Sequence, residues 1–135
     1  MSKAKVYYDG QVFKVRARFI EVEEGFPGGE DSLYHNVFRI IIDNGQVKRS
    51  FGFYSSHFDY LTGKTSLSAY KLIEIFKNFL QDSYLGSLSF EDFCKELGYS
   101  KDRKSYRIWK SCKRFFKKAK DLGIEDFTWE PELIE

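Results

Sequence analysis

The fold is decided by the stretch YHNVFRIIIDNGQVKRSFGFY, residues 34–54, which carries the strongest turn signal in the chain. Asn44-Gly45 separates two segments, Tyr34 to Asp43 and Gln46 to Tyr54, that contain many β-branched and aromatic residues. Gly adopts a positive φ at no steric cost and Asn tolerates it, so this dipeptide is typical of a β-hairpin. The stretch predicts two antiparallel strands.

A second hairpin signal lies upstream, where Asp9-Gly10 separates Val6 to Tyr8 from Gln11 to Val22. Gly25 to Gly29 then interrupts regular structure, and this segment lacks the Lys-Ser or Lys-Thr pair of a phosphate-binding loop. We therefore expect a surface turn there. The first half of the chain is predicted to be rich in β-structure.

The second half is predicted to contain about three helices. After Ser66 or Ser68 as the N-cap, apolar residues recur at the helical period, and this helix is expected to cover the sheet. A shorter helix begins after Ser89 and is expected to end at Gly98, which suits a left-handed C-cap.

A longer third helix is expected between a cap at Ser100 or Asp102 and a stop at Gly123. Its apolar and small residues cluster on one side of the helical wheel, and we expect Trp109, Cys112 and Phe116 to be buried together. The residues of this expected inner face are Ser105, Ile108, Trp109, Cys112, Phe115, Phe116 and Ala119.

The 135 residues, 42% hydrophobic and 31% charged, suffice for one domain but not for two well-packed ones. We predict an α+β fold in which an antiparallel sheet from the N-terminal half packs against the C-terminal helices. The single domain, 1–135, comprises a β-rich part (1–65), a helical part (66–123) and an acidic tail (124–135). The sequence shows neither a membrane span nor a signal peptide, so we expect a cytoplasmic protein without membrane partners.

The net charge of +2 conceals a strong separation of charge along the chain. Lys101 to Lys120 contains ten Lys or Arg and one acid, Asp102, a local balance of +9. Asp121 to Glu135 contains six acids and no base. A basic stripe is the usual electrostatic signature of a nucleic-acid or nucleoprotein partner.

On the wheel of the long helix, most of these cations lie opposite Trp109 and Cys112, with Tyr106 among them. Cations can contact phosphates while a Tyr ring stacks on a base. Two other interpretations stay open: a solvated helix back with Tyr106 packed on a neighbouring element, and a basic surface paired with acids of the same chain or of a homodimer partner. The candidate binding residues are Arg103, Tyr106, Arg107, Lys110, Lys113, Arg114 and Lys117.

The sequence gives no basis for a catalytic residue, a cofactor or a metal site. His35 and His57 have no nearby nucleophile or acid arrangement, and we expect them in a strand and in the loop Ser55 to Thr65. Cys94 and Cys112 lack metal-ligand spacing, and we interpret both as buried free thiols. Cys112 would acquire a lowered pKa beside the lysines only if it were exposed. We therefore expect a protein that is not an enzyme.

The block SFEDFCKELGYS, residues 89–100, continues through Arg103 and Tyr106 to Cys112. It resembles a block in small bacteriophage and prophage accessory proteins of undefined function, over about 24 of the 135 residues. The resemblance implies a short Phe-rich helix, a Gly-Tyr turn and a longer helix after a β-rich half, with no known active site.

A phage setting makes a non-enzymatic inhibitor or modulator of a host ribonucleoprotein or defence protein plausible, with small anti-CRISPR proteins as one such class. It would act in the host cytoplasm. The alternative is a phage accessory protein that binds DNA or RNA directly.

Overall fold

The structure is a computed structural model that describes residues 2–24, 34–54 and 66–134, with the side chains of residues 20–24, 34–37 and 54 excepted. The expected turn at Gly25 to Gly29, the loop at Ser55 to Thr65 and the side chains of His35 and His57 lie outside the described residues.

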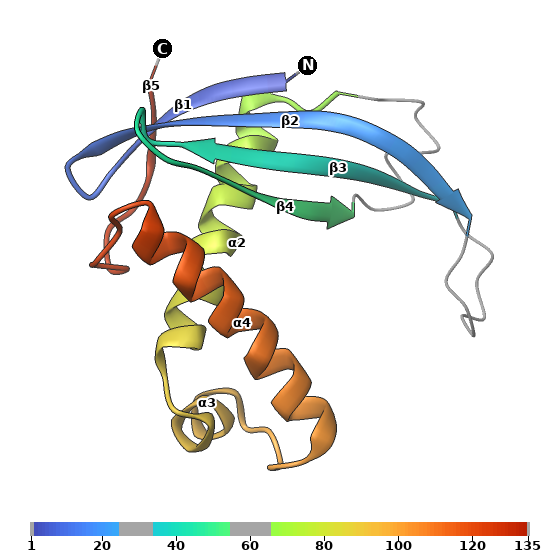
Figure 1. The fold of residues 1–135 in the computed structure, drawn as a ribbon, viewed down its shortest axis with the longest axis vertical. Coiled ribbons are helices and arrows are strands. Elements are labelled where there is room, and N and C mark those ends of the chain that lie inside the picture. Colours follow the sequence, from blue (N-terminus) through green and yellow to red (C-terminus); the bar gives the residue numbers. More distant parts are fainter. Residues whose placement is uncertain (1, 25–33, 55–65, 135) are drawn as a thin grey trace.

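Five strands form one antiparallel sheet in the order β4-β3-β2-β1-β5 (Figure 1). Three helices follow the fourth strand along the chain, so the predicted α+β fold is confirmed. The strands are β1 (Ser2–Tyr8), β2 (Gln11–Glu24), β3 (Tyr34–Asp43), β4 (Lys48–Tyr54) and β5 (Glu132–Ile134), and the helices are α2 (Ala69–Ser87), α3 (Phe90–Leu97) and α4 (Arg103–Asp121).

Both predicted hairpins are present. Asp9 and Gly10 have φ values of 50° and 73°, the conformation that a two-residue hairpin loop requires. The second loop is longer than predicted, because β4 begins at Lys48 rather than Gln46. The Asn44 side chain accepts hydrogen bonds from the backbone N–H groups of Gln46 and Val47, which holds these two residues in the loop.

The predicted helix caps are also present and explain where the helices begin. Ser68, Ser89 and Asp102 accept hydrogen bonds through their side chains from the third backbone N–H group of α2, α3 and α4, respectively. Gly98 ends α3 in the left-handed conformation, with φ 69°.

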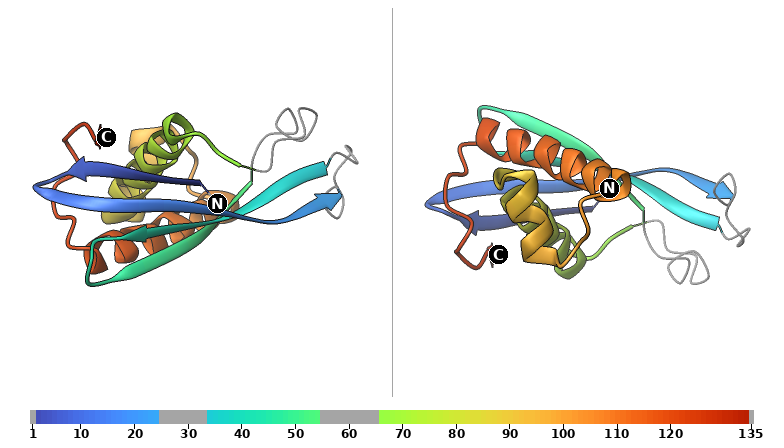
Figure 2. Two further views of the ribbon diagram at one scale, coloured as in Figure 1. Left: turned by 90° about the horizontal axis from the view of Figure 1, so that it is seen from above. Right: turned by 90° about the horizontal axis from the view of Figure 1, so that it is seen from below.

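The helices lie on one face of the sheet, and no described helix covers the other face (Figure 2). The main core lies between the inner sheet face and α2, around Phe13, Ile40, Leu72 and Phe76, which are almost fully buried. A second, smaller core surrounds Phe93 where α3 packs on the ends of α2 and α4, away from the sheet (Figure 1). α2 and α4 therefore connect two separate cores.

The segment expected to be an acidic tail is integrated into the fold. Leu122 and Ile124 are fully buried in the main core, and β5 adds the edge strand next to β1. The Asn44 side chain donates to the carbonyl oxygen of Leu122 at 3.1 Å, and the Gln11 side chain donates to that of Gly123 at 3.0 Å. The two hairpins thus hold the C-terminal end of α4.

α2 and α4 cross in close contact at Gly86. A Cβ atom at this position would overlap the backbone carbonyl group of Cys112 on α4. Only a residue without a side chain permits this approach, and backbone atoms cannot rotate away as a side-chain tip can.

We predict that Gly86→Ala separates the two helices and lowers the free energy of unfolding by about 3 kcal/mol, the cost of inserting a group into packed structure. Urea unfolding followed by circular dichroism measures this loss. Gly52→Ala is the matched control, because nothing lies within 4 Å of a Cβ there, and its effect should stay within about 1 kcal/mol. Equal stability of the two variants would contradict the close crossing.

Candidate binding surface

α4 presents the residues that the sequence identified as binding candidates. All seven side chains are exposed to solvent. We refer to them as the cationic face: Arg103, Tyr106, Arg107, Lys110, Lys113, Arg114 and Lys117.

Five cations of this face form a continuous row, in which each follows the previous one after three or four residues. Residues at this spacing are neighbours on a helix, and like charges there destabilise it by roughly 0.2–0.5 kcal/mol per pair. No acid interrupts the row. Its members are Arg103, Arg107, Lys110, Arg114 and Lys117.

The acids of the chain do not neutralise the cationic face within the described residues. The ion pairs there are Arg49–Asp121, Lys77–Glu130, Glu91–Lys95 and Glu91–Lys101, and none includes a residue of the face. Asp126, in the acidic C-terminal segment, accepts hydrogen bonds from Thr128 and Trp129, which lower the pKa of its carboxyl group. The positive field therefore stays directed at solvent.

Tyr106 is not a free stacking platform. Its side chain is 44% exposed, and its ring packs edge-on against Phe90 at 5.4 Å and obliquely against Trp109 at 5.5 Å. The Nζ atom of Lys110 lies 5.8 Å from the centre of the same ring. Phe90 lies on the neighbouring helix α3, so Tyr106 does pack on another element, while Trp109 and Lys110 are neighbours on α4 itself.

The aromatic cluster of Phe90, Tyr106 and Trp109 joins α3 to the N-terminal half of α4. Trp109 donates its indole N–H to the carbonyl oxygen of Leu88 at 3.0 Å, and Lys113 lies 4.6 Å from the centre of the Trp109 ring. A cation over an aromatic face is stabilised by the ring quadrupole. The cluster and its lysines hold this part of the surface in a defined shape.

The expected inner face of α4 is partly wrong. Cys112 and Trp109 pack in the smaller core, but Phe116 lies against Phe127, at 6.2 Å between ring centres, and does not join them. Ile108, expected to face inward, is 36% exposed. The residues of α4 that are buried are Ser105, Cys112 and Ala119, which form one narrow stripe at intervals of seven residues. Ile108 and Phe116 flank this stripe and are therefore less buried than predicted.

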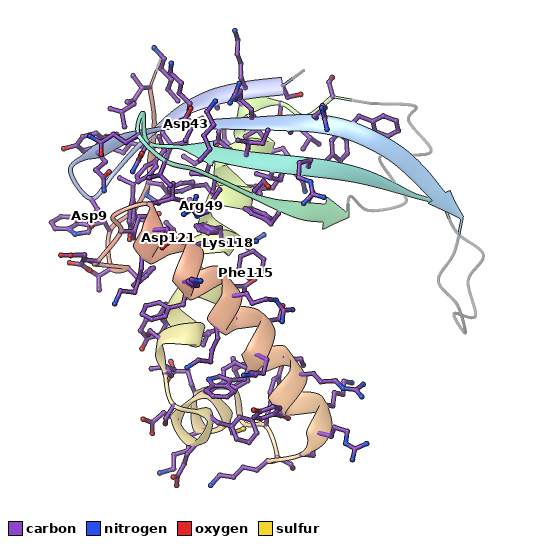
Figure 3. All side chains as sticks on the ribbon, in the orientation of Figure 1. Asp9, Asp43, Arg49, Phe115, Lys118 and Asp121 are labelled. Carbon is purple, nitrogen blue, oxygen red and sulfur yellow. The ribbon has the colours of Figure 1, made fainter. Side chains whose placement is uncertain are left out.

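The C-terminal half of α4 meets β4 at a polar contact (Figure 3). Arg49 pairs with Asp121 at 3.0 Å, and Lys118 donates to the carbonyl oxygen of Ser50 at 2.9 Å. Partial burial lowers the pKa of Lys118, and the positive charges of Arg114, Arg39 and Arg49 add to this effect.

Lys118 is not among the predicted binding candidates, and its hydrogen bond to Ser50 gives it a structural role. Arg114 and Lys118 extend the positive field of α4 toward the sheet. The sequence of α4 alone does not predict this extension of the positive field, because Arg39 and Arg49 belong to strands distant in the sequence.

The described residues contain no candidate metal cluster. In this part of the chain, no three His, Cys, Asp or Glu side chains lie close enough to hold a metal ion. None of the described helices combines the length and apolarity that crossing a membrane demands. Cys94 and Cys112 are both buried, as expected.

Burial raises the pKa of the Cys112 thiol to about 11, and the nearby charge of Asp82 contributes. We predict that native Cys112 reacts with iodoacetamide at pH 8 about 100-fold more slowly than an unperturbed thiol, because the thiolate is the reactive form. The pKa of Cys112 is higher in the folded chain than in the unfolded chain, so the neutral thiol contributes to the free energy of unfolding. This contribution is complete below about pH 9 and is lost as the pH rises to about 11. Mass spectrometry of labelled peptides measures the rate, and rapid native labelling of Cys112 would contradict its burial.

Comparisons with known protein families, with curated proteins and with solved structures find no match to this chain. The geometry and charge of the described residues are therefore the observations that point to a function. The most prominent feature is the exposed row of like charges on α4.

Proposed function

We propose that this chain is a non-enzymatic accessory protein of a phage or mobile element that binds a host nucleoprotein through the cationic face and thereby inhibits or modulates it. One observation carries the proposal: the cationic face is exposed, and no acid within the described residues pairs with it. The protein would act in the host cytoplasm.

The proposed mechanism is occupation of an acidic surface without turnover. Arg103, Arg107 and Arg114 each present planar N–H donors that can bind a phosphate or carboxylate with two hydrogen bonds. The face lies on a regular helix fixed at both ends, so little backbone conformational entropy is lost when a partner binds. A nucleoprotein offers both phosphates and carboxylates, and covering them would block its access to other ligands.

The phage setting is supported by the residues that resemble phage accessory proteins. In the structure, this block forms α3, the turn after Gly98 and the first half of α4. It therefore supplies both the aromatic cluster and the N-terminal part of the cationic face.

Direct binding of DNA or RNA by the cationic face is the alternative. The packing of Tyr106 leaves little of its ring for a base, so such binding would consist mainly of phosphate contacts. If the face made about six phosphate contacts, its affinity would fall by roughly 10³-fold or more when the salt concentration rises from about 50 to 200 mM. A desolvated protein interface would give a weaker dependence on salt.

We predict that Arg107→Glu, Lys110→Glu and Arg114→Glu together abolish capture of a nucleoprotein from host lysate. All three side chains are exposed, so each substitution should change the free energy of unfolding by about 0.5 kcal/mol or less. The measurement compares tagged wild type and variant after nuclease treatment, by mass spectrometry and thermal unfolding.

The matched control carries Lys3→Glu, Lys5→Glu and Arg18→Glu, which give the same change of net charge on exposed positions of the sheet. It should retain nuclease-resistant capture. Unfolding of the α4 variant would show that the cationic face is a structural contact, and equal capture by all three proteins would overturn the proposed function.

A further inference from the structure

The sheet face that the helices leave uncovered is also strongly basic. On β1 to β4, side chains that alternate with the core residues point away from the helices. Seven of them are cations: Lys3, Lys5, Lys14, Arg16, Arg18, Arg39 and Lys48. The acids among the described outward side chains of the sheet are Asp43, which accepts a hydrogen bond from Gly45 N–H at 2.7 Å, and Glu132 of β5, which is paired with Tyr7 of β1. We refer to this surface as the outer sheet face.

The register places like charges directly opposite one another in three places. Lys3 pairs with Arg16 and Lys5 with Lys14 between β1 and β2. Arg18 pairs with Arg39 between β2 and β3. The same register places the acid Asp43 opposite Lys14 and Lys48. Like charges in directly opposed positions destabilise a sheet, so stability does not account for this arrangement. An anionic ligand that bridges the cations would remove the repulsion.

The outer sheet face also has a hollow and an exposed aromatic ring, two features of surfaces that bind single-stranded nucleic acid. A hollow of about 770 Å³ is lined by five cations, by Asp43, and by apolar residues of β1, β5 and the start of α2. The cations are Lys3, Lys5, Lys14, Arg16 and Lys48. The Nε–H group of Arg16 is buried and has no acceptor among the described residues. Tyr7, which is 45% exposed, follows Lys5 by two residues and therefore lies on the same side of β1.

We propose that the outer sheet face binds a single strand of nucleic acid, with phosphates on the opposed cations and a base stacked on Tyr7. A single strand exposes both groups, whereas in a duplex the bases are stacked inside. Open sheets and positively charged grooves with exposed aromatic rings bind single strands in this way. This inference uses residues other than the cationic face of α4, so it goes beyond the proposed function.

The test is fluorescence anisotropy of the full chain with a labelled oligothymidylate of about 12 nucleotides. Four phosphate contacts would give a slope of about −3 for the logarithm of affinity against that of salt concentration. The sheet variant with Lys3→Glu, Lys5→Glu and Arg18→Glu should bind at least 30-fold more weakly. The α4 variant with Arg107→Glu, Lys110→Glu and Arg114→Glu carries the same change of net charge, and it should bind at least about 10-fold more tightly than the sheet variant.

The sheet variant should melt at the wild-type temperature or above it, because each substitution converts a like-charged pair into an oppositely charged one. If it unfolds instead, the neutral variant Lys3→Gln, Lys5→Gln and Arg18→Gln repeats the test. Tyr7→Ala should weaken binding by about 10-fold through loss of stacking.

Four results would overturn the proposal. The first is that wild type does not bind the oligonucleotide at about 50 mM salt. The second is an equal loss of oligonucleotide affinity in the sheet and α4 variants, and the third is a loss of affinity in the α4 variant alone. The fourth is that wild type binds phosphatidylserine vesicles but not the oligonucleotide. The second would indicate net charge alone, and the last an anionic membrane surface. Loss of oligonucleotide binding only in the sheet variant, with nucleoprotein capture lost only in the α4 variant, would support the two surfaces separately.

Discussion

The crossing of α2 and α4 at Gly86 determines where the positive charge of the molecule points. Because a Cβ at Gly86 would meet the backbone of Cys112, the two helices approach more closely than side chains would allow. From that point α4 extends in one direction to the aromatic cluster on α3 and in the other to β4 and the hairpin turns. The helix is thereby fixed at its middle and at both ends. The inner side of α4 makes these contacts, and the cations on its other side are exposed to solvent.

Repulsion between like charges is the common feature of the two basic surfaces. On α4 the cations follow one another at helical contact spacing, and on the outer sheet face they oppose one another across strands. Each such pair lowers stability by a few tenths of a kcal/mol or more. The buried aromatic and aliphatic residues around Phe13, Phe76 and Phe93 provide stability that can offset this cost. The fold thus holds like charges close together on both surfaces.

Local features were predictable from the sequence, because turn and cap preferences act over a few residues. The two predicted hairpin turns are at Asp9-Gly10 and Asn44-Gly45. The predicted helix caps include Ser68, Ser89 and Gly98. The cationic face was predictable as well, since helical periodicity alone places its residues on one side.

Features that depend on distant residues were not predictable in the same way. Nothing in the local sequence shows that Gly86 meets Cys112, or that Phe116 turns to Phe127 instead of joining Trp109. The packing of Tyr106 on Phe90 likewise depends on how α3 folds back. The alternation of Lys14, Arg16 and Arg18 with apolar residues does indicate a basic sheet face. The net charge of the block Lys101 to Lys120 does not reveal this face, because its cations lie elsewhere in the sequence.

On both surfaces, repulsion between the cations outweighs their attraction to the acids of the described residues; this is the central claim. Thermal unfolding of wild type in about 20 to 300 mM NaCl tests this claim directly, because salt over this range screens interactions between exposed charges. If like charges dominate, screening relieves their repulsion, and the midpoint temperature rises with salt. A midpoint that falls with salt would mean that favourable ion pairs within the chain dominate, and it would contradict the account.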